Sequence, residues 1–117
     1  MNYTTQTVKR NNVTYTVKVL ENGNKYWLNE EGQLDNERGP AVEWADGYKV
    51  YYSKGKRHKT DGPAVRYADG SKEYWLNDKL NRTDGPAIEY ASGNKYYYLN
   101  GKRYSYEEWK KEVENIN

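Results

Sequence analysis

The sequence predicts a mainly β protein: a single-layer antiparallel sheet of stacked β-hairpin repeats with a short C-terminal capping helix. A unit of 23 residues recurs along the chain, each unit alternates in the way that strands do, and the pattern becomes helical near the C-terminus. The 117 residues correspond to one domain. Within it we expect an N-terminal hairpin (1–22), the repeats (23–104) and the helix (105–117).

The composition favours a thin sheet over a thick aliphatic core. Leu, Ile, Val and Phe together supply only 16 residues, whereas the chain contains 14 Tyr and 4 Trp. Aromatic side chains of this kind carry a polar tip, which suits rings that lie half in water. The net charge of +2 is too small for charge repulsion to favour an unfolded chain.

The same composition argues against several functional classes. Cys is absent and there is one His, so we expect no disulfide, no thiolate nucleophile and no metal site. The sequence contains no nucleophile–base pair and no Gly-rich phosphate loop, which argues against an enzyme or a cofactor. Apolar runs typical of signal peptides or membrane spans are missing, and the interleaved charges form no polybasic cluster for a membrane surface. We therefore expect a cytoplasmic protein.

The repeat is marked by a Gly-Pro-Ala triplet that occurs three times at equal spacing, at residues 39–41, 62–64 and 85–87. An earlier, degenerate copy starts at Gly23 and has one extra residue near Glu30, which indicates a loop there. In each unit we expect two short strands. The first, such as 41–44, ends in an Ala-Asp-Gly or Ala-Ser-Gly turn, and the second ends at a turn such as Lys54-Gly55.

Equal spacing aligns like aromatic residues into rows across the sheet. We expect three such ladders, made of Trp44/Tyr67/Tyr90, Tyr51/Tyr74/Tyr97 and Tyr52/Trp75/Tyr98. Tyr and Trp provide rigid contact area and are enriched at binding hot spots, so exposed rows predict a binding surface. The sequence leaves open the alternative that these rows only stabilise the sheet.

The N-terminal segment predicts an opening hairpin. Residues 13–19 alternate strictly between apolar and polar side chains, and Asn11-Asn12 before them favours a turn that joins them to residues 3–9. The outer strand would leave an open edge with no charge between Thr4 and Val8. A homodimer through residues 3–9 is therefore one expected assembly.

The C-terminal segment changes from strand to helix. Ser105 and Glu108 have the spacing of a capping box, and Trp109 and Val113 would share one helix face. We expect this helix to end the array and to cover its last hydrophobic edge.

Several polar motifs recur once per unit and are interpreted as scaffold. Asp61 and Asp84 each follow a base by two residues, and we expect their carboxylates to bond nearby backbone amides in turns rather than to act in acid–base chemistry. His58 corresponds to Asn81 and Tyr104 in the next units, which indicates a polar turn flank rather than a general base.

Basic residues form a second recurring set. Lysines follow each hairpin Gly by two residues, and we expect them to pair with Glu43 and Glu89 on the facing strands; they are Lys25, Lys49, Lys72 and Lys95. Arg57 and Arg103 share a repeat position. Their guanidinium groups suit phosphate, so this set predicts a nucleotide or nucleic-acid site, with Lys56, Lys102, Tyr98 and Tyr104 beside it. The alternative is that these are charges that protect strand edges.

The 23-residue unit, its three Gly-Pro-Ala triplets and the Thr-Asp-Gly-Pro-Ala runs at 60–64 and 83–87 resemble the MORN repeat, in the variant found in proteins of bacteriophages and giant viruses. The resemblance covers about residues 23–104 and continues into the segment 104–109. The first unit departs from the pattern at residues 36–38, which replace Thr-Asp. The resemblance implies a single curved sheet that acts as a binding surface and performs no chemistry.

Two functional hypotheses follow. The first is a non-enzymatic phage or viral protein that binds and inhibits a host defence protein through an aromatic sheet face, in the cytoplasm of the host cell. Its candidate contacts are the rows Tyr51/Tyr74/Tyr97 and Tyr52/Trp75/Tyr98. The second is a binder of a signalling nucleotide or of nucleic acid through Arg57 and Arg103. Its expected signature is a steep dependence of affinity on salt.

Overall fold

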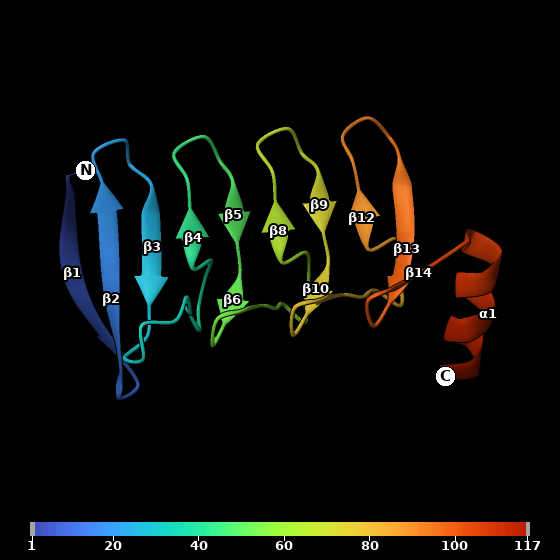
Figure 1. Cartoon of the computed structure of the whole chain (residues 1–117), viewed down its shortest axis with the longest axis horizontal. Coiled ribbons are helices and arrows are strands. Elements are labelled where there is room, and N and C mark those ends of the chain that lie inside the picture. The colour runs from blue at the N-terminus through green and yellow to red at the C-terminus, as the bar shows by residue number, and fades with distance from the viewer. Residues whose placement is uncertain (1, 117) are drawn as a thin grey trace.

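The computed structural model describes residues 2–116 and arranges them as one layer of antiparallel strands with a helix beyond its last strand (Figure 1). Ten strands form one sheet in the order β1-β2-β3-β4-β5-β8-β9-β12-β13-β14. The predicted fold class, a mainly β single-layer antiparallel sheet with one short C-terminal helix, is confirmed.

The sheet begins with three N-terminal strands, β1 (Tyr3–Arg10), β2 (Val13–Leu20) and β3 (Lys25–Leu28). β1 and β2 pair along their whole length through a two-residue turn at Asn11 and Asn12, which have φ of 49° and 66°. Asn tolerates this left-handed conformation, as the turn of a tight hairpin requires. β1 is the outer edge of the sheet.

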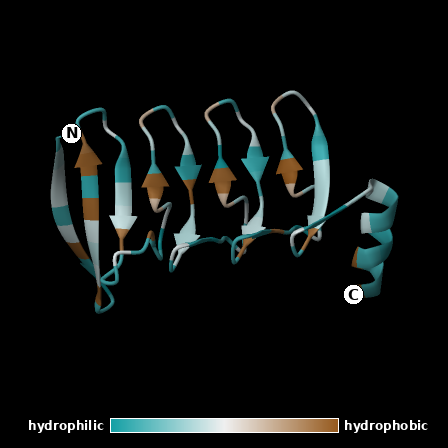
Figure 2. Ribbon diagram, viewed as in Figure 1, coloured by the Kyte–Doolittle hydropathy of each residue, from teal (hydrophilic) through white to brown (hydrophobic). Residues whose placement is uncertain are grey.

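Each Gly-Pro-Ala unit then adds one hairpin to the sheet. These hairpins are β4 (Val42–Glu43) with β5 (Lys49–Val50), β8 (Val65–Arg66) with β9 (Lys72–Glu73), and β12 (Ile88–Glu89) with β13 (Lys95–Leu99). The turn residues act as their types predict: Gly47 has φ of 103°, and the Asp46 carboxylate accepts a hydrogen bond from the Tyr48 amide at 2.9 Å. Figure 2 shows the first strand of each hairpin as its most hydrophobic part.

The expectation of two strands per unit is incomplete, because a returning strand follows the second extended segment of each Gly-Pro-Ala unit. The chain turns at Lys54-Gly55 and its equivalents and comes back as a short strand, forming β6 (Tyr52–Ser53) with β7 (Lys56–Arg57), β10 (Trp75–Leu76) with β11 (Lys79–Leu80), and β13 with β14 (Lys102–Tyr104). Their turns contain residues in the left-handed backbone conformation, such as Lys54 and Asn77. Returning strands of two or three residues are too short to show an alternating pattern in the sequence.

The small core lies between the strands of the first two hairpins. Val42, Val50 and Val65 are 6%, 2% and 2% exposed, and partly buried side chains pack against them, namely Tyr26, Leu34, Tyr48, Tyr52 and Trp75. The alanines of the Gly-Pro-Ala triplets are fully buried, as Ala41 and Ala64 illustrate. This position therefore accommodates only a small side chain.

Helix α1 (Tyr106–Ile116) ends the array as expected. The capping box forms in both directions: the Glu108 amide donates to Ser105 Oγ at 3.2 Å, and the Ser105 amide donates to Glu108 Oε1 at 3.1 Å. Trp109 is buried against the Tyr97 ring, with centroids 4.9 Å apart, and its indole N–H donates to the Arg82 carbonyl at 2.9 Å. The helix therefore covers the face that carries Tyr97.

Candidate functional site

The sheet has two unlike faces, because side chains alternate along every strand. One face, here called the open face, carries a row of seven register partners: Tyr26, Val42, Val50, Val65, Glu73, Ile88 and Tyr96. The other, here called the loop face, carries Trp27, Tyr51, Tyr74 and Tyr97. The predicted rows therefore separate: Tyr52/Trp75/Tyr98 lie on the open face and Tyr51/Tyr74/Tyr97 lie on the loop face.

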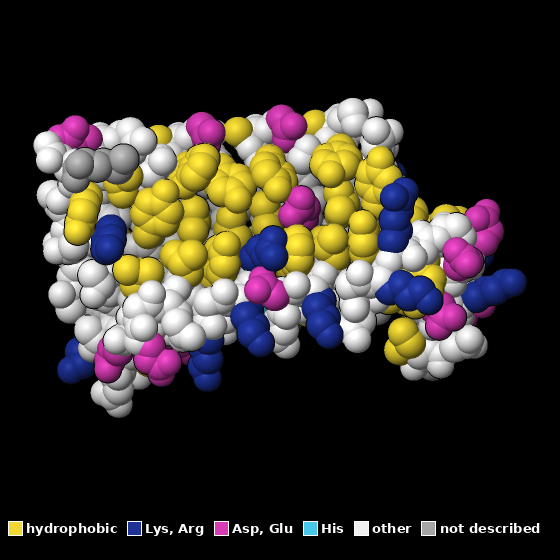
Figure 3. Space-filling model, viewed as in Figure 1, with side chains coloured by type: hydrophobic (Ala, Val, Ile, Leu, Met, Phe, Trp, Pro, Cys, Tyr) yellow, Lys and Arg dark blue, Asp and Glu magenta, His cyan; other side chains and the backbone are white. Residues whose placement is uncertain are grey.

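The open face is rich in accessible aromatic surface. Figure 3 shows a band of hydrophobic side chains that crosses this face over most of the sheet. The Trp44/Tyr67/Tyr90 row lies within reach of solvent, with exposed fractions of 40%, 37% and 42%. Patches of this kind on a folded protein mark interaction sites.

The rings do not contact one another as ladders of like residues, so that part of the expectation is wrong. The close ring pairs of the open face join different repeat positions: Trp44 with Tyr48 at 4.8 Å, Tyr48 with Tyr67 at 5.3 Å, and Tyr90 with Tyr96 at 5.8 Å. Like residues are two strands apart, about 9–10 Å at the usual strand spacing. The intervening strand therefore supplies the ring that each one touches.

Arg57 and Arg103, the candidate phosphate-binding residues, stack on aromatic rings of the open face. The Arg57 guanidinium lies 3.6 Å from the Trp75 ring centroid and pairs with the Asp78 carboxylate at 2.9 Å. Arg103 lies 4.5 Å from the Tyr96 centroid. The charge of Arg57 already has an acidic partner, whereas Lys56 and Lys102 are exposed at the start of the returning strands β7 and β14.

Glu73 is the unexpected member of the open face. It takes the register position that Val50 and Tyr96 hold in the neighbouring units. Its carboxylate accepts hydrogen bonds from the Tyr67 hydroxyl at 3.0 Å and from the Trp75 indole N–H at 2.9 Å. Burial, and then the negative charge of Glu73, raise the pKa of the Tyr67 hydroxyl, so that this group stays a donor.

On the loop face, another side chain covers each ring of the Tyr51/Tyr74/Tyr97 row. Lys59 Nζ lies 4.6 Å from the Tyr51 centroid and the Arg82 guanidinium lies 3.9 Å from the Tyr74 centroid, while Trp109 packs on Tyr97. The Tyr51/Tyr74/Tyr97 row is therefore less exposed than the Trp44/Tyr67/Tyr90 row of the open face.

The covering cations are held by Asp61 and Asp84, which corrects the expectation that these carboxylates bond backbone amides. Asp61 accepts from Lys59 Nζ at 2.6 Å, and Asp84 accepts from Arg82 Nε at 2.9 Å. Arg82 also reaches Glu89 at 3.3 Å. The acid–base spacing of two residues thus serves to fix a cation over a ring, which is a structural role.

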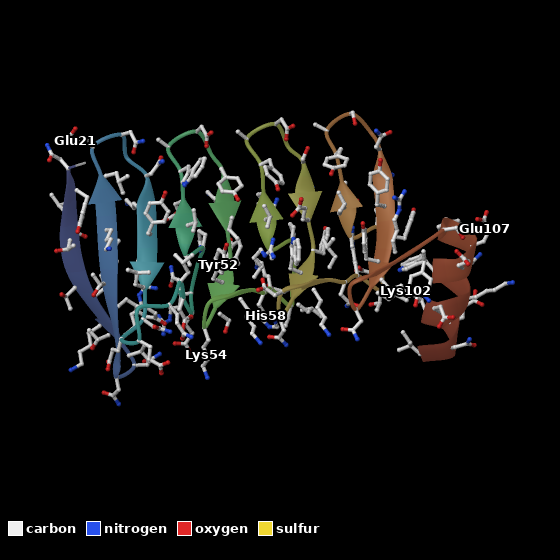
Figure 4. The ribbon with its side chains drawn as sticks, viewed as in Figure 1. Glu21, Tyr52, Lys54, His58, Lys102 and Glu107 are labelled. Carbon is white, nitrogen blue, oxygen red and sulfur yellow. The ribbon has the colours of Figure 1, made fainter. Side chains whose placement is uncertain are left out.

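His58 links one unit to the next, as a turn-flanking residue would. Its Nδ1 accepts a hydrogen bond from the Asn77 amide at 3.0 Å, and Asn81 Oδ1 accepts one from the Asn100 amide at 2.8 Å. His and Asn serve equally here because each offers an acceptor at a similar reach. Figure 4 shows His58 near Lys54, at the edge where the units turn.

The lysines after the hairpin Gly lie in register with the expected glutamates. Lys25 and Lys49 flank Glu43. The ion pairs formed within residues 2–116 lie elsewhere, however, and Glu89 pairs with Arg82 instead. The expected Lys–Glu pairs are therefore not formed, because exposed lysines gain little from holding one geometry.

Two equivalent hollows open on the loop face between successive units. One, of about 470 Å³, is bordered by Arg38, Tyr51 and Asp61; the other, of about 450 Å³, is bordered by Asp61, Tyr74 and Asp84. Both are polar, and their charged groups are largely paired with one another. Their recurrence with the repeat indicates a property of the scaffold.

Tyr48 and Glu73 are open-face residues that the sequence reasoning did not single out. Their signal is a departure from the repeat: Asn24, Ser71 and Asn94 occupy the position of Tyr48 in the other units. Aligning the units position by position, rather than looking for recurring residues, would have found both.

Comparisons of the chain with protein-family models, with curated proteins and with solved structures find no match. Within residues 2–116, the single helix is too short and too polar to cross a membrane.

Proposed function

We propose that this protein is a non-enzymatic binding module whose open face docks on another protein. The observation that carries the proposal is the exposed Trp44/Tyr67/Tyr90 row, on a face that no helix or loop within residues 2–116 covers. Exposed Trp and Tyr beside the hairpin turns of a sheet give contact area at low entropic cost. The resemblance to MORN-like repeats of phage and giant-virus proteins makes an inhibited host defence protein the first class of partner to test.

The test compares a variant of the open face with a matched variant elsewhere. Tyr67→Ser with Tyr90→Ser removes two exposed rings of the open face, whereas Tyr106→Ser removes an equally exposed ring on α1 (47%). Tagged protein is used to capture a partner from a host lysate, and the complex is reconstituted from purified components. We expect the open-face variant to lose at least about tenfold in affinity, measured by calorimetry, and the Tyr106 variant to keep it.

Retention of partner binding by the open-face variant would contradict the proposal. The second hypothesis, a nucleotide or nucleic-acid binder, is favoured by the exposed Lys56 and Lys102 at one edge. It predicts a bound nucleotide in native mass spectra and a steep loss of affinity with salt. The protein–protein complex gives a shallow salt dependence, because its contacts are mainly aromatic.

A further inference from the structure

A cleft of about 480 Å³ opens at the tips of the hairpins β4–β5 and β8–β9. Three rings form its walls, with centroids 4.8 Å apart for Trp44 and Tyr48 and 5.3 Å apart for Tyr48 and Tyr67. Asp46 and Asp69 also line it, and its lining includes neither Lys nor Arg. The cleft therefore combines flat aromatic walls with two carboxylates.

The carboxylates retain negative charge that the chain does not neutralise locally. Asp46 Oδ1 accepts from the Tyr48 amide at 2.9 Å, and Asp69 Oδ1 accepts from the Ser71 amide at 2.8 Å. These turn bonds use one oxygen of each carboxylate, and within residues 2–116 neither Asp forms an ion pair. The hydrogen bonds from the turn lower the pKa of Asp69, which therefore stays ionised.

The second ring cluster of the open face, Tyr90 with Tyr96, shows which kind of group stacks on such rings. There, Tyr96 contacts Tyr90 and carries the Arg103 guanidinium 4.5 Å from its centroid. Over the rings of Trp44, Tyr48 and Tyr67, no Lys or Arg of the described chain takes the corresponding place. The cleft has the same electron-rich ring faces and more negative charge around them.

Tyr48, which forms one wall of this cleft, stands where the other units have Asn or Ser. At the same position, Asn24 Oδ1 accepts from the Ala45 amide and Ser71 Oγ accepts from the Ala91 amide, both at 2.9 Å. These bonds tie one hairpin tip to the next. A Tyr ring replaces such a bond with a cleft wall, and a departure of this kind from a regular scaffold is expected at a functional position.

We propose that the cleft binds an arginine side chain of the partner protein. A planar guanidinium stacks on indole and phenol rings and donates several hydrogen bonds, so rings and carboxylates are used together. Lysine offers no flat surface for stacking. The inference rests on the proposed function and deepens it, because it names the chemistry that the open face recognises.

The probe is an acetylated and amidated Gly-Arg-Gly peptide, titrated into the full chain while the indole N–H signal of Trp44 is followed by NMR. We expect a saturable shift of this signal with a dissociation constant in the millimolar range. The matching peptide with citrulline, which keeps the shape and lacks the charge, should bind at least about tenfold more weakly. Equal shifts with the arginine, lysine and citrulline peptides would overturn the proposal.

Two variants test the site itself. Tyr48→Asn restores the residue of the neighbouring units and removes a wall, and Asp46→Asn with Asp69→Asn removes the charge while the amide oxygen can still accept the turn bond. Both variants should bind the arginine peptide at least about fivefold more weakly, and their circular dichroism spectra should be unchanged. Asp61→Asn on the loop face is the control and should bind normally. Unchanged binding by both cleft variants would also overturn the proposal.

These results are separate from those that test the proposed function. If the peptide fails to bind while the open-face variant still loses its partner, only the arginine site is wrong. If the peptide binds in the cleft but no partner depends on the open face, the proposed function is wrong.

Discussion

At the scale of single residues, short polar side chains set the turns and tie neighbouring units together. The Asp78 carboxylate accepts from the Arg57 amide at 3.0 Å and from the Arg57 guanidinium at 2.9 Å, across 21 residues of sequence. His58 and Asn81 make similar links at the same edge. These contacts join successive units.

The Asp78 contact predicts a dependence of stability on pH. Its hydrogen bonds from the Arg57 amide and guanidinium lower the pKa of Asp78 from its ordinary value of 3.8. The contribution of Asp78 to the free energy of unfolding is therefore fully present above pH 3.8 and is lost as the pH falls through the lower pKa of the folded state. Asp78→Asn should reduce the free energy of unfolding near neutral pH by no more than about 1 kcal/mol, and the difference from the wild type should vanish in acid.

Urea unfolding at a series of pH values measures this difference. Glu114→Gln, on the exposed side of α1, is the control and should give a curve that parallels the wild type. A difference between Asp78→Asn and the wild type that stays constant from neutral pH to strong acid would show that charge at Asp78 plays no part.

At the scale of elements, each strand of the repeats is only two to five residues long, and within residues 2–116 the strands form a single layer (Figure 1). Stability therefore depends on what each element contributes at its ends. The hairpins gain it from turn residues in the left-handed region, such as Asn77 and Asn100, and α1 gains it from its capping box and from Trp109.

The capping box predicts a measurable cost when it is broken. Ser105→Ala removes the acceptor of the Glu108 amide and should lower the free energy of unfolding by about 1 kcal/mol. Ser53→Ala, at an exposed strand position, is the matched control and should change it much less. Urea unfolding followed by circular dichroism measures both; equal effects of the two substitutions would argue that the cap is not formed in solution.

At the scale of the whole molecule, the single layer makes the protein elongated. Its principal extents are 49 × 32 × 18 Å and its radius of gyration is 16.2 Å, against about 13 Å for a compact domain of this length. Its accessible surface is 7564 Å², more than the roughly 6,600 Å² usual for its mass. A shape of this kind exposes two broad faces and two edges, and α1 covers one end.

At the other end of the molecule, the outer strand β1 is open, and we expect the protein to self-associate through it. β1 is the outer edge of the sheet and its first five residues are exposed. Two copies could pair their β1 strands antiparallel about a two-fold axis. We expect a dimer in sedimentation velocity runs at high micromolar concentration, and Thr5→Lys with Thr7→Lys, which places charges on β1, should give the monomer.

The control for added charge is Ser53→Lys. Ser53 is exposed on β6, which already pairs with β7, so this substitution should leave the dimer intact. A wild type that sediments as a monomer across the same concentrations would remove this prediction.

The regular parts of the fold were the most predictable. Asn11-Asn12, the Gly of each hairpin and the box at Ser105 and Glu108 have local preferences that agree with the final structure, so each was found from its neighbours alone. The returning strand of each unit was not found, because two or three residues are too few to show a period. Of the residues proposed from the sequence for binding, the row Tyr52/Trp75/Tyr98 lies on the open face, whereas Tyr48 and Glu73 were not singled out.

The sequence by itself determined the repeat, its 23-residue period, the turns and the terminal helix, because these depend on spacing and on local backbone preference. Only the tertiary structure decided which face each aromatic row occupies and which rings are covered. That choice depends on where the loops carry Lys59 and Arg82 and on where α1 places Trp109. These contacts form only when the chain folds back over the strand it has just left, which local backbone preference does not decide. The open face is thus a product of what the loops leave uncovered.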